Sequence, residues 1–298
     1  MPDRNTSYIN CIAHESSEGN LLIGDTHSAF IDCGMAFCAA ETIQKAKKAL
    51  GGRPLDYIFL THTHYDHIGA LPSFRNEWPQ LRTVTSAAGA EVLLKDTPRR
   101  VIAELSLVAG QAYGITAESL SDVFLDTSVF RGDVIVKDGD SICLGGLTVK
   151  VLETPGHTRD SLSFIIPELE LLILSETLGV LMPDGSVYPC YLTGYADTIS
   201  SIEKCRKISH RFLSVSHRGI ITAEEAKGFF DKALAANTAC RDFILGMKDK
   251  GLDEDQMQDL FFQQYCSEAL LSFQPKEAFM TNARATIACT LREELSGP

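Results

Sequence analysis

Residues 59–72, "FLTHTHYDHIGALP", carry the strongest signal in the sequence, because they place three histidines and one aspartate within six positions. The preceding residues, 55–59, are mostly apolar and predict a buried strand that ends where the histidines begin. His62 and His64 are two residues apart, so at a strand end both side chains point to one side. Asp66 and His67 follow in the turn and the opening of a helix. Imidazole and carboxylate groups bind Zn²⁺, Fe²⁺ or Mn²⁺, so the stretch predicts part of a metal site.

The missing ligands of such a site each have a candidate at the end of another expected strand. These candidates are His157 after residues 147–153, Glu176 after residues 171–175, and His217 after residues 212–216. Functional groups in α/β proteins gather at strand ends and in the loops that follow them. We therefore expect a dinuclear site in which His157 completes the first ion, His217 serves the second and Glu176 bridges both.

Short β-branched runs alternate with helical patterns through the first two hundred residues, which predicts an α/β fold. Residues 39–50 are predicted to form an amphipathic helix that ends at the glycines following it. Residues 97–127 have helical apolar spacing and are expected to form an insertion. Thr222 and Glu225 form a capping-box pattern, after which the sequence is helical almost to its end. We expect a domain over residues 1–222 and a C-terminal helical cap over residues 223–298.

Composition narrows the class of protein. The 298 residues are 45% hydrophobic and 22% charged, as in an ordinary globular enzyme, and the net charge of −12 disfavours nucleic acid or anionic lipid as a partner. No apolar stretch reaches the ~20 residues needed to span a bilayer, and the first residues have no pattern of an export signal. The nine cysteines contain no CxxC pair, which favours reduced thiols and a cytoplasmic location.

Taken together, "THTHYDH", "TPGHT", an acidic residue after a strand and a late "SH" resemble the metallo-β-lactamase fold superfamily over about residues 8–222. The resemblance implies an αββα sandwich with two divalent metal ions at one edge and with the helical extension at the C-terminus. It also implies that Asp32 is a buried support near the site, although a plain turn aspartate before Gly34 would fit the sequence equally. Two positions depart from the family pattern: Glu176 replaces the usual aspartate, and His217 lacks flanking glycines on both sides.

The branch of the superfamily is less clearly marked. His64 stands where the diiron flavoproteins carry glutamate, and the acidic composition argues against the nucleases of this fold. A weaker similarity links the chain to a thioesterase branch that includes the quinolone-signal response protein, which has a helical C-terminal extension. That similarity implies a set of pocket-lining residues, for which ordinary packing is the alternative: Leu178, Tyr188, Tyr191, Phe279 and Asn282.

The expected activity is hydrolysis of a small-molecule ester, thioester or lactone by water activated between two metal ions. Asp66 would bind the second ion and relay a proton. A different interpretation needs His62, His64 and His157 around one iron, which would oxidise a thiol or persulfide. A third is a regulatory binding protein that keeps its metals. The expected partner is a small-molecule substrate, and a homodimer stays open.

Overall fold

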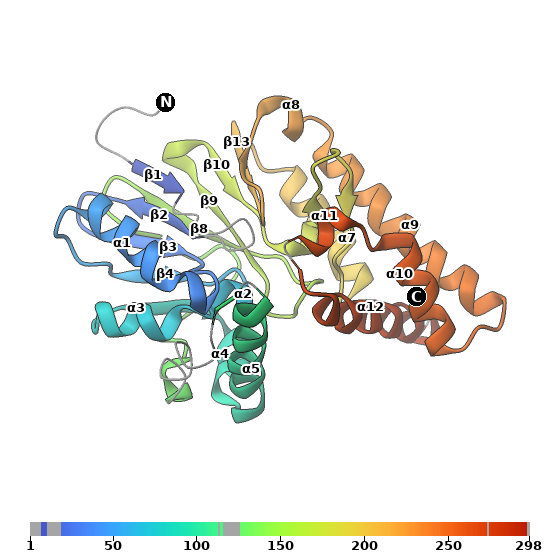
Figure 1. Cartoon of the computed structure of the whole chain (residues 1–298). Coiled ribbons are helices and arrows are strands. Elements are labelled where there is room, and N and C mark those ends of the chain that lie inside the picture. Colours follow the sequence, from blue (N-terminus) through green and yellow to red (C-terminus); the bar gives the residue numbers. More distant parts are fainter. Residues whose placement is uncertain (1–6, 11–18, 113, 116–125, 273, 297–298) are drawn as a thin grey trace. The chain divides into compact units, whose positions relative to one another are not determined.

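The computed structural model describes residues 7–10, 19–112, 114–115, 126–272 and 274–296, with helices and strands in a mixed α/β arrangement (Figure 1). The strands are β1 Ser7–Asn10, β2 Asn20–Ile23, β3 Ser28–Ile31, β4 Tyr57–Phe59, β5 Arg82–Ser86, β6 Val134–Val136, β7 Ser141–Cys143, β8 Thr148–Glu153, β9 Leu162–Ile166, β10 Leu171–Ile173, β11 Val180–Leu181, β12 Val187–Tyr188, β13 Phe212–Val215 and β14 Gly219–Ile221. The α-helices are α1 Ala39–Leu50, α2 Tyr65–Ile68, α3 Leu71–Glu77, α4 Ala87–Leu94, α5 Asp96–Ala112, α7 Tyr195–Arg206, α8 Ala223–Ala226, α9 Phe229–Asp249, α10 Glu254–Tyr265, α11 Glu268–Leu271 and α12 Lys276–Ser296.

The chain divides into two compact units. Unit 1 comprises residues 1–153 and 162–173, and unit 2 comprises residues 154–161 and 174–298. This division follows packing within the chain, and the expected domain boundary at residue 222 stays a prediction. Of the expected insertion, helix α5 is present, whereas the part with Leu120 and Phe124 lies outside the described residues.

Unit 1 contains a six-stranded sheet in the order β1-β2-β3-β4-β5-β6. The first three strands are antiparallel, whereas β3, β4, β5 and β6 run parallel, with Ile31 opposite Phe59 and Phe59 opposite Val84. Parallel strands deliver their carboxyl ends to the same edge of the sheet. The loop that follows β4 at this edge carries the histidine stretch.

A second layer of unit 1 is formed by strands β10, β9, β8 and β7, which pair antiparallel in that order. Phe59 on β4 and Phe164 on β9 meet edge to face, with ring centroids 5.6 Å apart. Apolar side chains from the two sheets are therefore buried against each other. This packed core supports the end of β4, which His62 follows closely.

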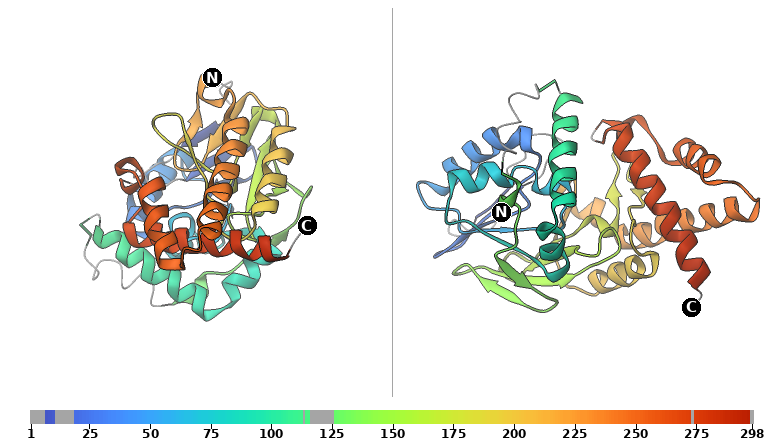
Figure 2. Two further views of the ribbon diagram at one scale, coloured as in Figure 1. Left: turned by 90° about the vertical axis from the view of Figure 1, so that its right-hand side faces the viewer. Right: turned by 90° about the horizontal axis from the view of Figure 1, so that it is seen from below.

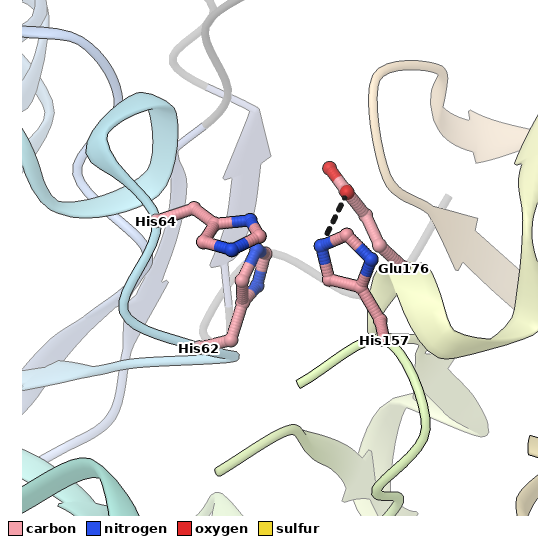
Figure 3. A group of neighbouring side chains, drawn as sticks. All are labelled: His62, His64, His157 and Glu176. Carbon is pink, nitrogen blue, oxygen red and sulfur yellow. Dashed lines mark ion pairs between the residues drawn. The ribbon is translucent and has the colours of Figure 1, made fainter. Parts of the chain in front are cut away.

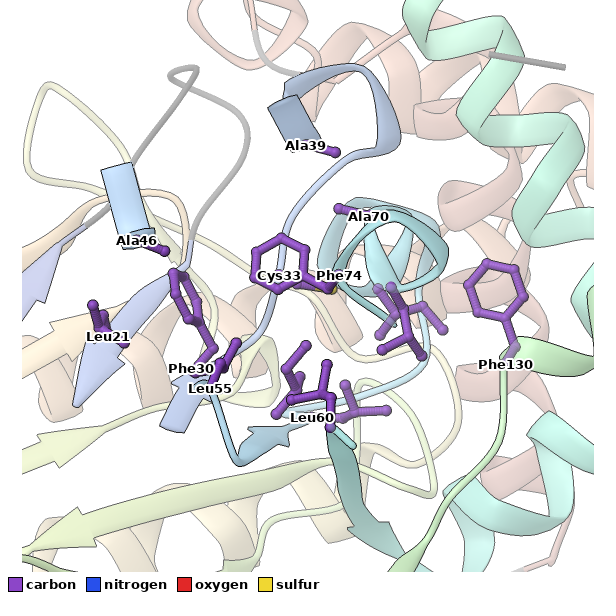
Figure 4. Close-up of a cluster of buried hydrophobic side chains, with 14 of the residues drawn as sticks. Leu21, Phe30, Cys33, Ala39, Ala46, Leu55, Leu60, Ala70, Phe74 and Phe130 are labelled. Atoms are coloured by element: carbon purple, nitrogen blue, oxygen red, sulfur yellow. The ribbon is translucent and has the colours of Figure 1, made fainter. Parts of the chain in front are cut away.

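The other face of the first sheet is covered by helices α1 and α3 (Figure 4). Phe30 on β3 and Phe74 on α3 are fully buried and pack edge to face at 5.2 Å. Ala46 on α1 is equally buried. Helix α1 also buries Leu50 on this face, as the amphipathic pattern of residues 39–50 predicted. Burying a leucine or phenylalanine side chain contributes about 1.5–3 kcal/mol each.

Unit 2 is mainly helical and carries two short hairpins, β11–β12 and β13–β14. Helix α12 packs on α9 and α10, as the two views of Figure 2 show. Thr222 and Glu225 form the predicted capping box, since each side chain binds the other's backbone amide. The described part of the chain thus confirms the α/β class with C-terminal helices. Among the helices described, none has the length and apolar character that a bilayer span requires.

Candidate metal centre

The histidine stretch of unit 1 folds into a tight turn between β4 and the short helix α2, with His64 at the N-cap. The ring centroid of His62 lies 4.6 Å from that of His64 and 4.1 Å from that of His67, and Figure 3 shows the first pair. His62 and His67 are buried, and His64 is partly exposed. The turn therefore gathers three imidazoles, and the rings of His62 and His64 lie together as their two-residue spacing predicted.

Asp32 and Thr61 form hydrogen bonds with the rings of His67 and His62. The carboxylate of Asp32 accepts hydrogen bonds from the Thr61 amide (2.8 Å), the Thr61 hydroxyl (2.6 Å) and Nδ1 of His67 (2.8 Å). The Thr61 Oγ1 also lies 3.1 Å from Nδ1 of His62. Asp32 adopts a left-handed backbone conformation with φ 55°, so the turn before Gly34 aims its carboxylate at the histidines. It is the buried support that the family resemblance implied.

Asp66 lies one residue before His67 on α2, and its Oδ2 is 3.7 Å from Nε2 of that histidine. Its side chain keeps 17% of its surface exposed, against 3% for His67. A carboxylate at the edge of a buried histidine cluster can bind a cation and still exchange protons with water.

Unit 2 supplies His157 from a turn that has a glycine before it. Gly156 has φ +140°, and a Cβ there would lie 2.0 Å from Oγ1 of Thr198, so the turn requires glycine. The His157 amide donates to Oγ1 of Thr177 (3.1 Å), and Nδ1 of its ring donates to the carbonyl of Cys190 (2.6 Å). The ring is fully buried and fixed at two points.

Glu176 lies directly after the strand pair β9–β10, between two histidines of unit 2. Its Oε2 is 3.0 Å from Nε2 of His157, as Figure 3 shows, and its Oε1 contacts Nε2 of His217. His217 follows β13 in a left-handed conformation, with φ 62°, which is uncommon for a residue with a side chain. Such backbone strain concentrates at functional sites.

Burial and the neighbouring charges act in opposite directions on the pKa values of Glu176 and His157. Burial alone would raise the pKa of Glu176, but His217 and His157 outweigh it and hold that pKa well below its usual range. Burial would lower the pKa of His157, but the acidic groups of Cys190 and Glu176 raise it well above its usual value. A buried carboxylate held ionised in this way requires positive charge at the two imidazoles, which protons or a metal cation can supply.

The hydrogen bonds also fix which ring nitrogen can bind a metal. A carbonyl can only accept, so Nδ1 of His157 carries a proton, and Nε2, which lies 3.0 Å from Oε2 of Glu176, is the nitrogen that would bind a metal in exchange for its own proton. The Thr61 hydroxyl donates to Asp32, so it accepts from Nδ1 of His62, and His67 donates through Nδ1 to the same carboxylate. Metal-binding histidines commonly donate their other ring N–H to a carboxylate or carbonyl. The donor set therefore fits a divalent metal.

Each unit thus brings together its own share of the expected ligands. Unit 1 gathers His62, His64, Asp66 and His67, and unit 2 gathers His157, Glu176 and His217. Their assignment to metal ions stays a prediction.

The expected pocket residues all belong to unit 2. Tyr188, Tyr191 and Phe279 are part of its buried apolar cluster, Leu178 is fully buried, and Asn282 is partly exposed. Their role in binding a substrate is untested.

Two supporting groups could not be assigned from the sequence. Thr61 stands beside His62 in the motif, and its position one residue before a ligand is the signal that could have identified it. The carbonyl of Cys190 orients His157, but every residue carries a carbonyl, so nothing in the residue type marks this one.

Comparisons with known proteins identify the family of the chain. The family model described as the metallo-beta-lactamase superfamily matches residues 20–217. A metallo-beta-lactamase fold-containing protein of Sulfurisphaera tokodaii is 23% identical over 205 residues, 68% of this chain and 72% of that protein. A hydroxyacylglutathione hydrolase of Brucella anthropi is 27% identical over 166 residues, 56% of this chain and about half (49%) of the relative.

Solved structures show the same fold at low identity. A metallo-beta-lactamase family protein from Thermus thermophilus aligns with a TM-score of 0.59 and 18% identity, covering 97% of this chain and 94% of that one. The family match extends over most of the chain and includes the seven candidate ligands. The chain therefore belongs to the metallo-beta-lactamase superfamily.

Proposed function

We propose that this chain is a metal-dependent hydrolase that uses two divalent ions to cleave a small-molecule ester, thioester or lactone. One observation carries the proposal: in His62, His67 and His157, Nδ1 faces an acceptor, so Nε2 is the nitrogen that would bind a cation. Histidines that bind metals commonly donate their other ring N–H to a carboxylate, a carbonyl or another acceptor. Zn²⁺, Fe²⁺ and Mn²⁺ all suit a site of imidazoles and carboxylates.

The proposed site has two sets of four side chains. By this proposal, His62, His64 and His157 would hold one ion, Asp66, His67 and His217 would hold the other, and Glu176 would serve both. Glu176 belongs to both sets because its two oxygens face different histidines. A shared carboxylate would offset part of the charge of two cations. Glutamate has a longer reach than the aspartate usual at this position.

When bound, two such ions lower the pKa of a water molecule and polarise a substrate carbonyl. We assign Asp66 to hold the second ion and to relay a proton, because it is a carboxylate that is partly exposed, whereas the carboxylate of Glu176 is buried. A thiolate leaves with little need for a proton, since thiols have a pKa of about 8.5. The chain's residues therefore suit thioester hydrolysis without a dedicated acid.

The superfamily match supports hydrolysis as the reaction class, and the Brucella relative is a hydrolase of hydroxyacylglutathione by name. We propose that this chain cleaves the same class of bond, a thioester. The chain's net charge of −12 makes a small molecule the expected substrate, in preference to nucleic acid or a membrane. A cytoplasmic location and a homodimer stay proposals.

We further propose that Leu178, Tyr188, Tyr191, Phe279 and Asn282 line the place where the acyl group binds. Tyr188 and Phe279 are neighbours in unit 2, with ring centroids 6.2 Å apart. Leu178 lies two residues after Glu176 in the same short helical turn. An apolar acyl chain would suit this surrounding better than a charged one.

The experiment that tests the proposal is elemental analysis of protein purified without chelating resin, followed by turnover assays on a panel of esters, thioesters and lactones. Two ions per chain with metal-dependent turnover support it. One iron per chain with oxygen-dependent thiol oxidation would instead establish a dioxygenase. Bound metal with no turnover, together with capture of a specific partner, would establish a regulatory protein.

A further inference from the structure

His157 is the ligand candidate whose position depends most on distant parts of unit 2. Its ring is oriented by the carbonyl of Cys190 at 2.6 Å. The sulfur of Cys190 also lies 3.9 Å from Oε2 of Glu176. One residue therefore touches both His157 and the proposed bridging carboxylate, with its backbone and its side chain.

Cys190 begins a segment, residues 190–196, that we call the strap. The strap curls around the carbonyl of Gly156, the residue before His157. Backbone amides of Leu192 (3.1 Å), Thr193 (2.9 Å) and Gly194 (3.2 Å) all point at this oxygen, and the Thr193 hydroxyl adds a fourth contact at 3.1 Å. With so many donors on one carbonyl, the turn that bears His157 moves with the strap.

The strap is held in turn by the last turns of helix α12. The carboxylate of Glu293 accepts the amides of Tyr195 (2.9 Å) and Ala196 (3.2 Å), which are the first two residues of α7. The N-cap residue of α7, Gly194, has no side chain to perform this function. A carboxylate at a helix N-terminus is stabilised by the unpaired amides and by the helix dipole.

Two further contacts join α12 to the strap. A guanidinium nitrogen of Arg292 donates to the carbonyl of Thr193 at 2.9 Å. The hydroxyls of Tyr191 and Thr290 are 2.8 Å apart, and both residues are buried. The end of α12 thus contacts the strap at its beginning, middle and end.

We propose that Glu293 is a positioning residue for the metal centre: through the strap, α12 sets the orientation of His157 and thereby the retention of the ion that His157 binds. The inference rests on the proposed metal centre. It extends that proposal because it assigns part of metal binding to the C-terminal helix, which supplies none of the candidate ligands. A mere cap on α7 would stabilise the helix and leave metal retention unchanged.

The test compares Glu293→Ala with Glu294→Ala in the holoprotein. Glu294 is the next residue, is exposed, and pairs with Arg241 at 3.5 Å, so its loss changes charge and helix propensity in the same way. The readouts are the rate at which Zn²⁺ passes to a chelator and the visible spectrum of the Co²⁺-substituted protein. Loss of a supporting partner of a metal ligand typically weakens metal affinity by about 10–100-fold. On that scale we expect about 10-fold faster loss in Glu293→Ala, an altered Co²⁺ spectrum, and less than about 2-fold in the control.

A double variant separates positioning from general stability. A His157→Ala background is expected to lose the ion that His157 holds, so the retention of the second ion is measured there. Glu293→Ala should no longer change that retention, because residues that act through one another give non-additive effects. If Glu293→Ala fails to fold, Thr290→Val, which removes the hydroxyl that meets Tyr191, takes its place in the same assays.

Equal metal retention in the Glu293 and Glu294 variants would overturn the inference, as would an undiminished effect in the His157→Ala background. A wild-type protein that binds no divalent metal would instead overturn the proposed function. The two failures are therefore distinguishable.

Discussion

The two groups of candidate ligands are built in different ways. In unit 1 the ligands lie within one turn of chain, His62 to His67, and are supported by the side chains of Asp32 and Thr61. In unit 2 His157, Glu176 and His217 come from three separate strand ends, and His157 is oriented by a backbone carbonyl.

This contrast indicates which substitutions would disturb the geometry of each group. A local motif keeps its geometry as long as its own turn folds. A dispersed group depends on every segment that holds its members, including a helix with no ligand of its own. Substitutions remote from the ligands should therefore affect the unit 2 group more often than the unit 1 group.

The largest expected effect comes from removing one ligand from each group. His62→Ala and His157→Ala should both lose bound metal and reduce turnover by more than about 10²-fold, if the groups serve one centre. Metal content by mass spectrometry and kcat on the best ester or thioester check this. His210→Ala is the matched control, since that ring binds the carbonyl of Ile208 and lies outside both groups. A His157→Ala variant with full metal and normal turnover would remove the unit 2 group from the centre.

Glu176 tests whether the unit 2 group serves two ions. Glu176→Gln keeps the size but removes the charge, so we expect the metal count to fall toward one and hydrolysis to fall by about 10²-fold or more. Glu176→Asp keeps the charge with a shorter reach and should be milder. Titration of apoprotein with Zn²⁺ measures the stoichiometry. Two tightly bound ions in Glu176→Gln would place the bridge elsewhere.

The support of the unit 1 group should matter less than its ligands. Asp32→Asn exchanges a carboxylate oxygen for an amide that donates, so one of its contacts with Thr61 or His67 must be lost. The expected weakening of metal affinity is about 10–100-fold, as for other partners of metal-bound histidines. Chelator competition measures it. If Asp32→Asn weakens metal binding no more than Glu293→Ala does, the side-chain contacts of Asp32 and the contacts of the strap support the ligands equally.

The smallest effect on metal is expected at Asp133, whose carboxylate binds Arg75 (2.6 Å) and the Thr83 amide (2.8 Å) in the body of unit 1. Asp133→Asn should lower the free energy of unfolding at pH 7 by about 1–3 kcal/mol, because buried Arg75 loses its charged partner. Metal retention should stay at the wild-type value.

This carboxylate also gives a pH dependence of known sign. Burial would raise the pKa of Asp133, but the Thr83 amide and Arg75 lower it overall. The stability that Asp133 contributes is therefore fully present above the pKa of about 3.9 that an aspartate has in the unfolded chain. This contribution is lost as the pH falls through the lower pKa that Asp133 has in the folded protein. Urea denaturation at pH 7 and pH 3 measures the free energy of unfolding. The difference in this free energy between wild type and Asp133→Asn should be smaller at pH 3. An unchanged difference would contradict this account.

Features that depend on neighbours along the chain could be predicted from the sequence. The apolar run before His62 predicted strand β4, the spacing of His62 and His64 predicted rings on one side, and the amphipathic pattern predicted α1 over residues 39–50. These signals are readable because strand and helix periodicity and strand-end position are local properties.

The groups that hold the ligands emerged only from the folded chain. The acceptors that fix the ring nitrogens are Asp32, Thr61 and the carbonyl of Cys190, and the last of these is a backbone atom that no residue type reveals. The contact of Glu293 with the start of α7 joins segments far apart in the chain, and periodicity carries no information about such pairs. Local patterns could place the candidate ligands at strand ends, but the orientation of each ring depended on packing between distant segments.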